Sequence, residues 1–150
     1  MPITTPSTVD QPADNDNRVR GSRTAARAGW VLTSLVVLFL LIDGITHVLK
    51  IQPVLDSFRD LGFPASTAAG IGIIELVCLA LHVVPRTSVL GALLLTAYLG
   101  GAVAAQVRIE APLASTTLFP VYTAVLLWTG LCLRDNRART LLPLRQPEQA

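Results

Sequence analysis

Residues 28–49 read AGWVLTSLVVLFLLIDGITHVL, an apolar run with one acidic residue, Asp43, and one histidine, His47. As an α-helix rising 1.5 Å per residue, this stretch is about 33 Å long, and the hydrocarbon core of a bilayer is about 30 Å thick. The run is too long for the apolar core of a cleavable signal peptide, and no Ala-x-Ala site follows it. It therefore predicts a transmembrane helix that stays in place as a signal anchor.

The composition of the whole chain agrees with a membrane protein. Of the 150 residues, 51% are hydrophobic and only 15% are charged, and the mean hydropathy is +0.55. One soluble domain of this length cannot bury so much apolar surface, whereas lipid can cover it. The net charge of +2 comes without a basic stripe carrying interleaved aromatic residues, so nothing supports nucleic-acid binding.

Three further apolar segments predict three more spans, over about residues 64–84, 88–106 and 115–133. Pro120 falls inside the last segment, where we expect it in the first turn of a helix because its missing N–H costs little there. A helix starting at Pro120 would be only about 21 Å long, so we also expect ordered structure before it, or a kink. The predicted fold is all-α, a four-helix transmembrane bundle.

The connection between the first two spans predicts a short helix at the membrane interface. Over residues 51–61, apolar and charged side chains separate onto two faces at the helical period. The apolar face carries Val54, Leu55, Phe58 and Leu61, and the other face carries Asp56, Arg59 and Asp60.

The basic residues predict the orientation. Nine lie on the side of both tails and of the second connection: Arg18, Arg20, Arg23, Arg27, Arg86, Arg134, Arg137, Arg139 and Arg145. Three lie on the other side: Lys50, Arg59 and Arg108. This bias places both termini in the cytoplasm, for a multi-pass protein of a bacterial cytoplasmic membrane. Residues 1–27 are expected to be a disordered tail because they lack apolar periodicity, residues 28–135 the membrane domain, and residues 136–150 a second polar tail.

Small residues are expected to hold the bundle together, because lipid offers no hydrophobic gain when helices associate. The third segment has Ala97, Gly101 and Ala105 at successive fourth positions, and the second segment has Ala68 and Gly72. Packing within the bundle is favoured over dimerisation, since the chain already supplies four helices.

Polar and ionisable side chains at membrane depth are costly and are functional-site candidates by default. Here they are Asp43, His47, Glu75, Tyr98, Gln106 and Arg108. We predict a pocket open to the outer side, lined by Asp43, His47, Gln106 and Arg108, with Glu75 at its floor. Such a pocket can hold a quinone head group, relay a proton or bind a metal ion. The plainer alternative, which the residues alone favour, is that these groups only pair with one another and join helices.

No sequence motif assigns a catalytic residue or a set of metal ligands. Phosphate-binding loops, nucleophile elbows, HExxH and haem-attachment motifs are missing. The two cysteines, Cys78 and Cys132, stand alone in separate apolar segments and are expected to be buried and inert. We therefore expect no catalysis by this chain on its own.

Several blocks of sequence point to a family. They are Gly62-Phe63-Pro64, the stretch from Gly72 to Leu76, the run from Leu90 to Ala102, the segment from Leu118 to Val121, and the stretch from Leu131 to Asp135. Together they resemble the DoxX-like family of small four-helix bacterial membrane proteins, over about residues 30–143. The most specific parts are the run in the third span and the mid-membrane glutamate, Glu75, which matches the family's second-span carboxylate.

The resemblance implies a function as well as a fold. The family is named for a membrane subunit associated with thiosulfate:quinone oxidoreduction, other relatives are linked to oxidative-stress complexes, and most members have no established activity. It implies an accessory or anchor subunit of a quinone-linked redox system, with a redox-enzyme subunit as partner and a quinone as ligand. Two other functions stay open: a small proton-coupled transporter or channel-like protein that uses Glu75 and Asp43, and a structural scaffold without a ligand.

Overall fold

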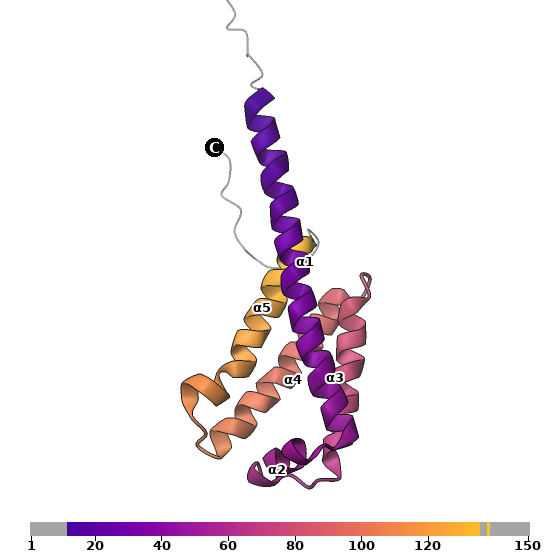
Figure 1. The fold of residues 1–150 in the computed structure, drawn as a ribbon, viewed down its shortest axis with the longest axis vertical. Coiled ribbons are helices and arrows are strands. Elements are labelled where there is room, and N and C mark those ends of the chain that lie inside the picture. The colour runs from indigo at the N-terminus through magenta and orange to yellow at the C-terminus, as the bar shows by residue number, and fades with distance from the viewer. Residues whose placement is uncertain (1–11, 136–137, 139–150) are drawn as a thin grey trace, which may run out of the picture.

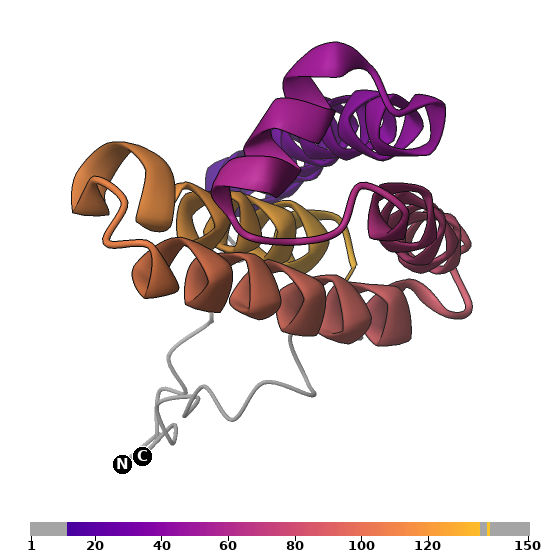
Figure 2. The ribbon, with the colours of Figure 1, turned by 90° about the horizontal axis from the view of Figure 1, so that it is seen from below.

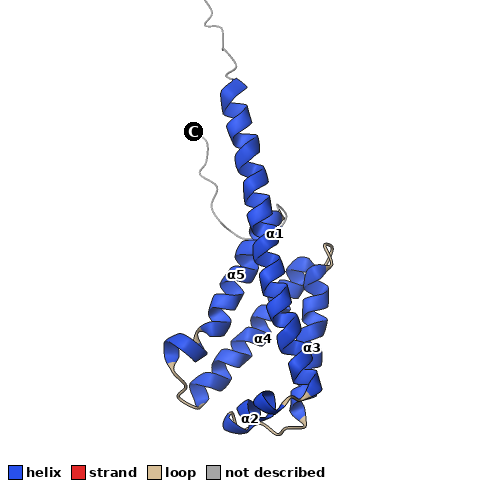
Figure 3. Ribbon diagram, in the orientation of Figure 1, coloured by secondary structure: helices blue, strands red, loops and turns tan. Residues whose placement is uncertain are grey.

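The computed structural model describes residues 12–135 and 138, and every regular element in this part of the chain is a helix (Figure 3). In chain order the elements are α1 (Pro12–Leu49), α2 (Gln52–Asp60), α3 (Thr67–Val83), α4 (Ser88–Arg108), the short π-helix η1 (Leu113–Thr117) and α5 (Phe119–Arg134). The predicted all-α bundle is confirmed, and the short helix expected within residues 51–61 is present as α2.

The four long helices form a ring, in an order that the sequence did not reveal. Helix α1 packs against α3 and α5, and α4 completes the ring by packing against the same two helices (Figure 2). Helix α2 lies across one end of the bundle, at the end of α1 where that helix is followed by Lys50 (Figure 1). The turn between α3 and α4 lies at the opposite end.

Within the described part of the chain, three segments are long and apolar enough to cross a membrane: Thr24–Leu49, Ser88–Arg108 and Leu113–Arg134. Helix α3 has 17 residues, about 25 Å, which is the lower end of the range for a transmembrane helix. It is shorter than the predicted span because residues 61–66, around Pro64, form turns and a loop before the helix begins.

The outer surface of the ring is apolar. Large hydrophobic side chains at least 54% exposed point away from the bundle: Leu35, Ile42, Ile74, Val77, Leu93 and Val125. A monomeric soluble protein rarely exposes so extensive an apolar surface, whereas lipid tails cover it without cost. The arrangement is that of a helical membrane bundle.

The first helix begins earlier than predicted. Helix α1 starts at Pro12, so residues 12–27 are helical where we expected a disordered tail, and residues 1–11 lie outside the described part. The helix can extend in this direction because lengthening an existing helix fixes few additional dihedral angles for each new hydrogen bond. Ala25, Ala26 and Arg27 also favour the extension, since they are good helix formers. The predicted C-terminal tail, residues 136–150, lies outside the described residues except for residue 138.

The last of the four predicted spans begins as Pro120 led us to expect. This proline lies in the first turn of α5, and η1 precedes it, joined through Leu118. Helix α5 alone has 16 residues, about 24 Å, so η1 supplies the additional length of the apolar segment Leu113–Arg134. The prediction of ordered structure before Pro120 is confirmed.

Small residues bring the helices together, but only in part at the predicted positions. Ala68 is fully buried, and a Cβ placed on Gly72 would lie 2.7 Å from the carbonyl oxygen of Gly44 on α1. On α4, in contrast, Ala97 and Gly101 are exposed, and no atom lies within 4 Å of a Cβ placed on Gly101.

The face that α4 buries is a different one from its stripe of small residues. Gly91, Ala92, Leu95 and Leu99 are its buried residues together with Ser88. The expectation that Ala97 and Gly101 pack against another helix of the bundle is therefore wrong for the described chain. The spacing of small residues in the sequence identifies the stripes on α3 and α4. It does not show on which side of each helix a neighbouring helix lies.

Gly72→Ala is expected to destabilise the protein, by about 1–3 kcal/mol for overpacking, because the new methyl group would overlap the α1 backbone. Gly70→Ala is the matched control on the same helix, since nothing lies within 4 Å of its added Cβ. That substitution should leave stability unchanged or raise it by up to about 1 kcal/mol. Unfolding of both variants in mixed detergent micelles measures the difference, and equal stabilities would contradict the close approach of α1 and α3.

Candidate functional site

The close contact between α1 and α3 positions the candidate site. A Cβ on Gly44 of α1 would lie 2.8 Å from the Leu76 side chain and 3.5 Å from Oε2 of Glu75. Glu75 lies one turn after Gly72 on α3, so its side chain reaches α1 where the two backbones are closest. The absence of a side chain at Gly44 leaves the space that the Glu75 carboxylate approaches.

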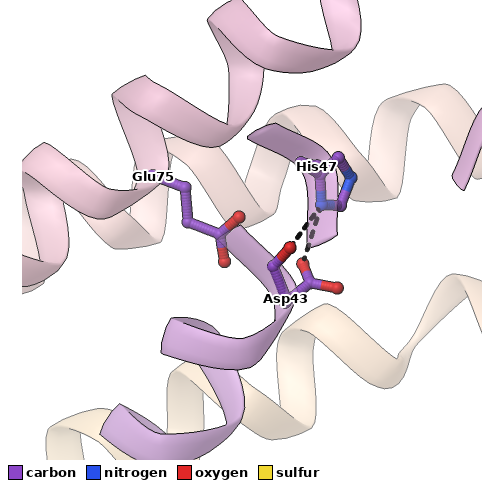
Figure 4. Close-up of side chains that lie close together, drawn as sticks. All are labelled: Asp43, His47 and Glu75. Atoms are coloured by element: carbon purple, nitrogen blue, oxygen red, sulfur yellow. Dashed lines mark hydrogen bonds and ion pairs between the residues drawn. The ribbon is translucent and has the colours of Figure 1, made fainter. Parts of the chain in front are cut away.

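Three predicted site residues converge there and form what we call the carboxylate–histidine cluster: Asp43, His47 and Glu75. One side-chain oxygen or nitrogen from each lies within 4.8 Å of the others (Figure 4). His47 Nδ1 lies 2.8 Å from the main-chain oxygen of Asp43 and 3.7 Å from its carboxylate oxygen Oδ2. Glu75 is fully buried, whereas the side chain of Asp43 is 39% exposed and that of His47 is 16% exposed.

Tyr98 of α4 extends the cluster to a third helix. Its hydroxyl donates a hydrogen bond of 3.0 Å to Oε2 of Glu75. The other carboxylate oxygen, Oε1, is buried and has no hydrogen-bond partner within the described chain. Leaving a buried polar atom unpaired costs about 1–3 kcal/mol, so this oxygen is poised to take a proton or a ligand.

A largely apolar groove, which we call the α4 groove, lies on one side of the cluster. Its volume is about 360 Å³, and its lining comes from α1, α2, α3, α4 and the α2–α3 connection: His47, Phe58, Leu61, Phe63, Ile71, Ala97, Tyr98, Gly101, Ala102 and Ala105. The small residues of α4 thus create open space instead of a helix contact. His47 and Tyr98 are the lining residues that bring polar atoms to it.

A second, more polar space, which we call the α2 hollow, lies between the end of α1 and α2. Its volume is about 300 Å³, and its lining residues are Asp43, Thr46, His47, Ile51, Pro53, Val54 and Ser57. His47 lines both spaces. The cluster therefore borders both spaces, the polar hollow through Asp43 and His47 and the apolar groove through His47.

Gln106 and Arg108 do not join the cluster, and neither lines the α4 groove or the α2 hollow. Arg108 donates a hydrogen bond to the carbonyl oxygen of Leu61, and its guanidinium lies 5.5 Å from the centre of the Phe63 ring. It ties the end of α4 to the connection between α2 and α3. The single polar pocket predicted from depth in the membrane is thus two spaces of different chemistry.

Residues of α2 contribute to the site, although the sequence assigned that helix only to the interface. Phe58 is 5% exposed, and its ring packs edge-on against His47 with the ring centres 5.5 Å apart. Leu61 lines the α4 groove and Ser57 the α2 hollow. The apolar face of residues 51–61 was the available signal, because such a face needs a partner.

The model of the DoxX-like family matches residues 31–130. The chain belongs to the DoxX-like family. No curated protein matches the chain, and no solved structure does. Family membership and the apolar helices together identify it as an integral membrane protein, and the match contains the whole carboxylate–histidine cluster and Tyr98.

Tyr98→Phe is expected to destabilise this DoxX-like protein by about 1–3 kcal/mol, because the buried Glu75 would lose its hydrogen-bond donor. Tyr122→Phe is the matched control, since Tyr122 is 49% exposed; it should change stability by no more than about 0.5 kcal/mol. Reversible unfolding in mixed micelles compares the two. Equal effects would show that the bond to Glu75 contributes nothing to stability.

Proposed function

We propose that this protein is an accessory or anchor subunit of a quinone-linked membrane redox system, and that the α4 groove binds the head group of a lipid quinone. The observation that carries the proposal is an apolar groove whose polar lining residues adjoin a buried carboxylate: Tyr98 bonds to Glu75, and His47 lies beside it in the cluster. In this proposal the chain binds the quinone, and a partner enzyme transfers the electrons.

The groove matches the chemistry of a quinone head group. Its volume of about 360 Å³ lies within the usual range for small-molecule pockets, about 300–1,000 Å³. Apolar walls suit the faces of the ring, while the Tyr98 hydroxyl and the His47 imidazole offer hydrogen bonds to its oxygens. Ala97 and Gly101 are exposed residues of α4, so the groove opens on the apolar surface where a lipid-soluble ligand would arrive.

Reduction of a quinone to a quinol takes two electrons and two protons, and the cluster offers a path for the protons. Tyr98, Glu75, Asp43 and His47 form a series of polar groups between the α4 groove and the α2 hollow. Protons that follow this series avoid the hydrocarbon of the bilayer, where charge is expensive. The electrons come from the partner subunit.

We also propose four crossings of a bacterial cytoplasmic membrane, with both termini in the cytoplasm. The bias of nine basic residues against three supports this orientation. The end of α1 beside Lys50, α2 and η1 lie at one end of the bundle, opposite the α3–α4 turn with Arg86. Helix α3 packs between α1 and α4, so it would cross together with them despite its length.

A proton-coupled transporter is the second candidate. It is favoured because Asp43 lines the α2 hollow and lies beside Glu75 in the cluster. Glu75→Gln in proteoliposomes distinguishes the two. A transporter would lose pH-driven flux in this variant, whereas a quinone-binding subunit would show no such flux in either form. A scaffold without a ligand would retain assembly and bind no quinone.

Gly101→Leu is expected to weaken quinone binding by at least about tenfold, or ~1.4 kcal/mol, because its side chain would fill the α4 groove. Gly100→Leu is the matched control: it adds the same bulk at the next residue, which is also exposed and has nothing within 4 Å of an added Cβ, but does not line the groove. Ubiquinone and menaquinone retained per chain after size-exclusion chromatography, measured by mass spectrometry, give the comparison. Unchanged retention in Gly101→Leu would remove the groove as the binding site.

A further inference from the structure

We infer that Asp43, His47 and Glu75 form a binding site for a divalent transition metal ion of the Zn²⁺ type. The inference goes beyond quinone binding and does not depend on it, since Asp43 and Glu75 do not line the α4 groove and only His47 is shared with it. One imidazole and two carboxylates provide the ligands, from two different helices.

The spacing of these groups suits a metal ion. Zn²⁺ binds nitrogen and oxygen ligands at about 2.0–2.2 Å, so ligand atoms around a tetrahedral ion are about 3.4 Å apart. The three atoms here lie within 4.8 Å of one another, and a contraction of about 1.4 Å would enclose an ion. Asp43 is the most exposed of the three side chains and borders the α2 hollow, so it has the room to make that movement. Nδ1 of His47, the ring nitrogen near Asp43, would lose its proton and exchange its hydrogen bond to the main-chain oxygen of Asp43 for the ion.

The independent evidence for a ligand is the Glu75 carboxylate. It is fully buried and faces Asp43 and His47 (Figure 4), and its Oε1 has no hydrogen-bond donor within the described chain. A cation supplies the missing partner and offsets the repulsion between the two neighbouring carboxylates. Tyr98 holds the other oxygen, the kind of outer contact that orients a metal-binding carboxylate.

The α2 hollow supplies access and room for a further ligand. It borders Asp43 and His47 and is also lined by the hydroxyl residues Thr46 and Ser57. Three protein ligands with an open position are the pattern of catalytic zinc sites, where water takes the fourth place. An imidazole ligand favours zinc and other transition metals over Mg²⁺ and Ca²⁺, which prefer oxygen ligands alone.

The test is metal binding by the full-length, untagged protein in mild detergent after treatment with EDTA. Calorimetric titration with ZnCl₂ is expected to show one ion per chain, and MgCl₂ is expected to show none. Asp43→Asn and His47→Ala should each weaken zinc binding by at least about tenfold. Asp56→Asn is the matched control, because this carboxylate is on α2 and pairs with Arg59 outside the cluster; its zinc affinity should be unchanged.

A second measurement guards against variants that fail to fold. Because the ion would join α1 to α3, zinc should raise the unfolding temperature of the unmodified protein and of Asp56→Asn, but not of Asp43→Asn. No binding by the unmodified protein, or binding that Asp43→Asn and His47→Ala leave unchanged, would overturn the inference. Quinone retention measured on the same EDTA-treated samples tests the proposed function separately, since it reports the α4 groove without the ion.

Discussion

The approach of α1 to α3 at Gly44 and Gly72 is the contact on which the candidate site depends. Helices in lipid gain nothing from hiding apolar surface from each other, so close packing of backbones must hold them. Here that packing has a second consequence. It brings Glu75 of α3 against Asp43 and His47 of α1, so the contact that stabilises the bundle also gives the fully buried Glu75 carboxylate its polar neighbours.

Small residues have two opposite uses in this protein. On α3, Ala68 and Gly72 are buried and admit a neighbouring backbone. On α4, Ala97 and Gly101 admit no neighbour and instead leave the α4 groove open beside Tyr98. The same residue types thus hold one pair of helices together and keep a space free on another helix, which is where a lipid-soluble ligand could enter from the membrane.

The sequence predicted what is local and missed what depends on the arrangement of the helices. The four apolar helices, the short helix at residues 52–60 and the interruption before Pro120 follow from composition, period and proline chemistry, and all are present. Depth along a helix placed Asp43, His47 and Glu75 in one predicted pocket, and the structure brings these three side chains together. Depth also grouped Gln106 with them, although at 100° per residue Gln106 is about 80° around α4 from Tyr98. Without the order of the helices in the ring, no rule on one chain could select Gly44 as the partner of Gly72.

His47 links the two proposed ligands physically, because it lines both the α4 groove and the α2 hollow. An ion in the cluster would draw the imidazole toward Asp43 and Glu75, and a quinone in the groove would draw it toward the opposite side. If both sites are occupied in the membrane, the affinity of each ligand must depend on the other by the same factor, as thermodynamic linkage requires. Phe58 packs edge-on against this imidazole, so α2 is the element placed to bias its position. Helix α2 is then part of the site, not only a connection between α1 and α3.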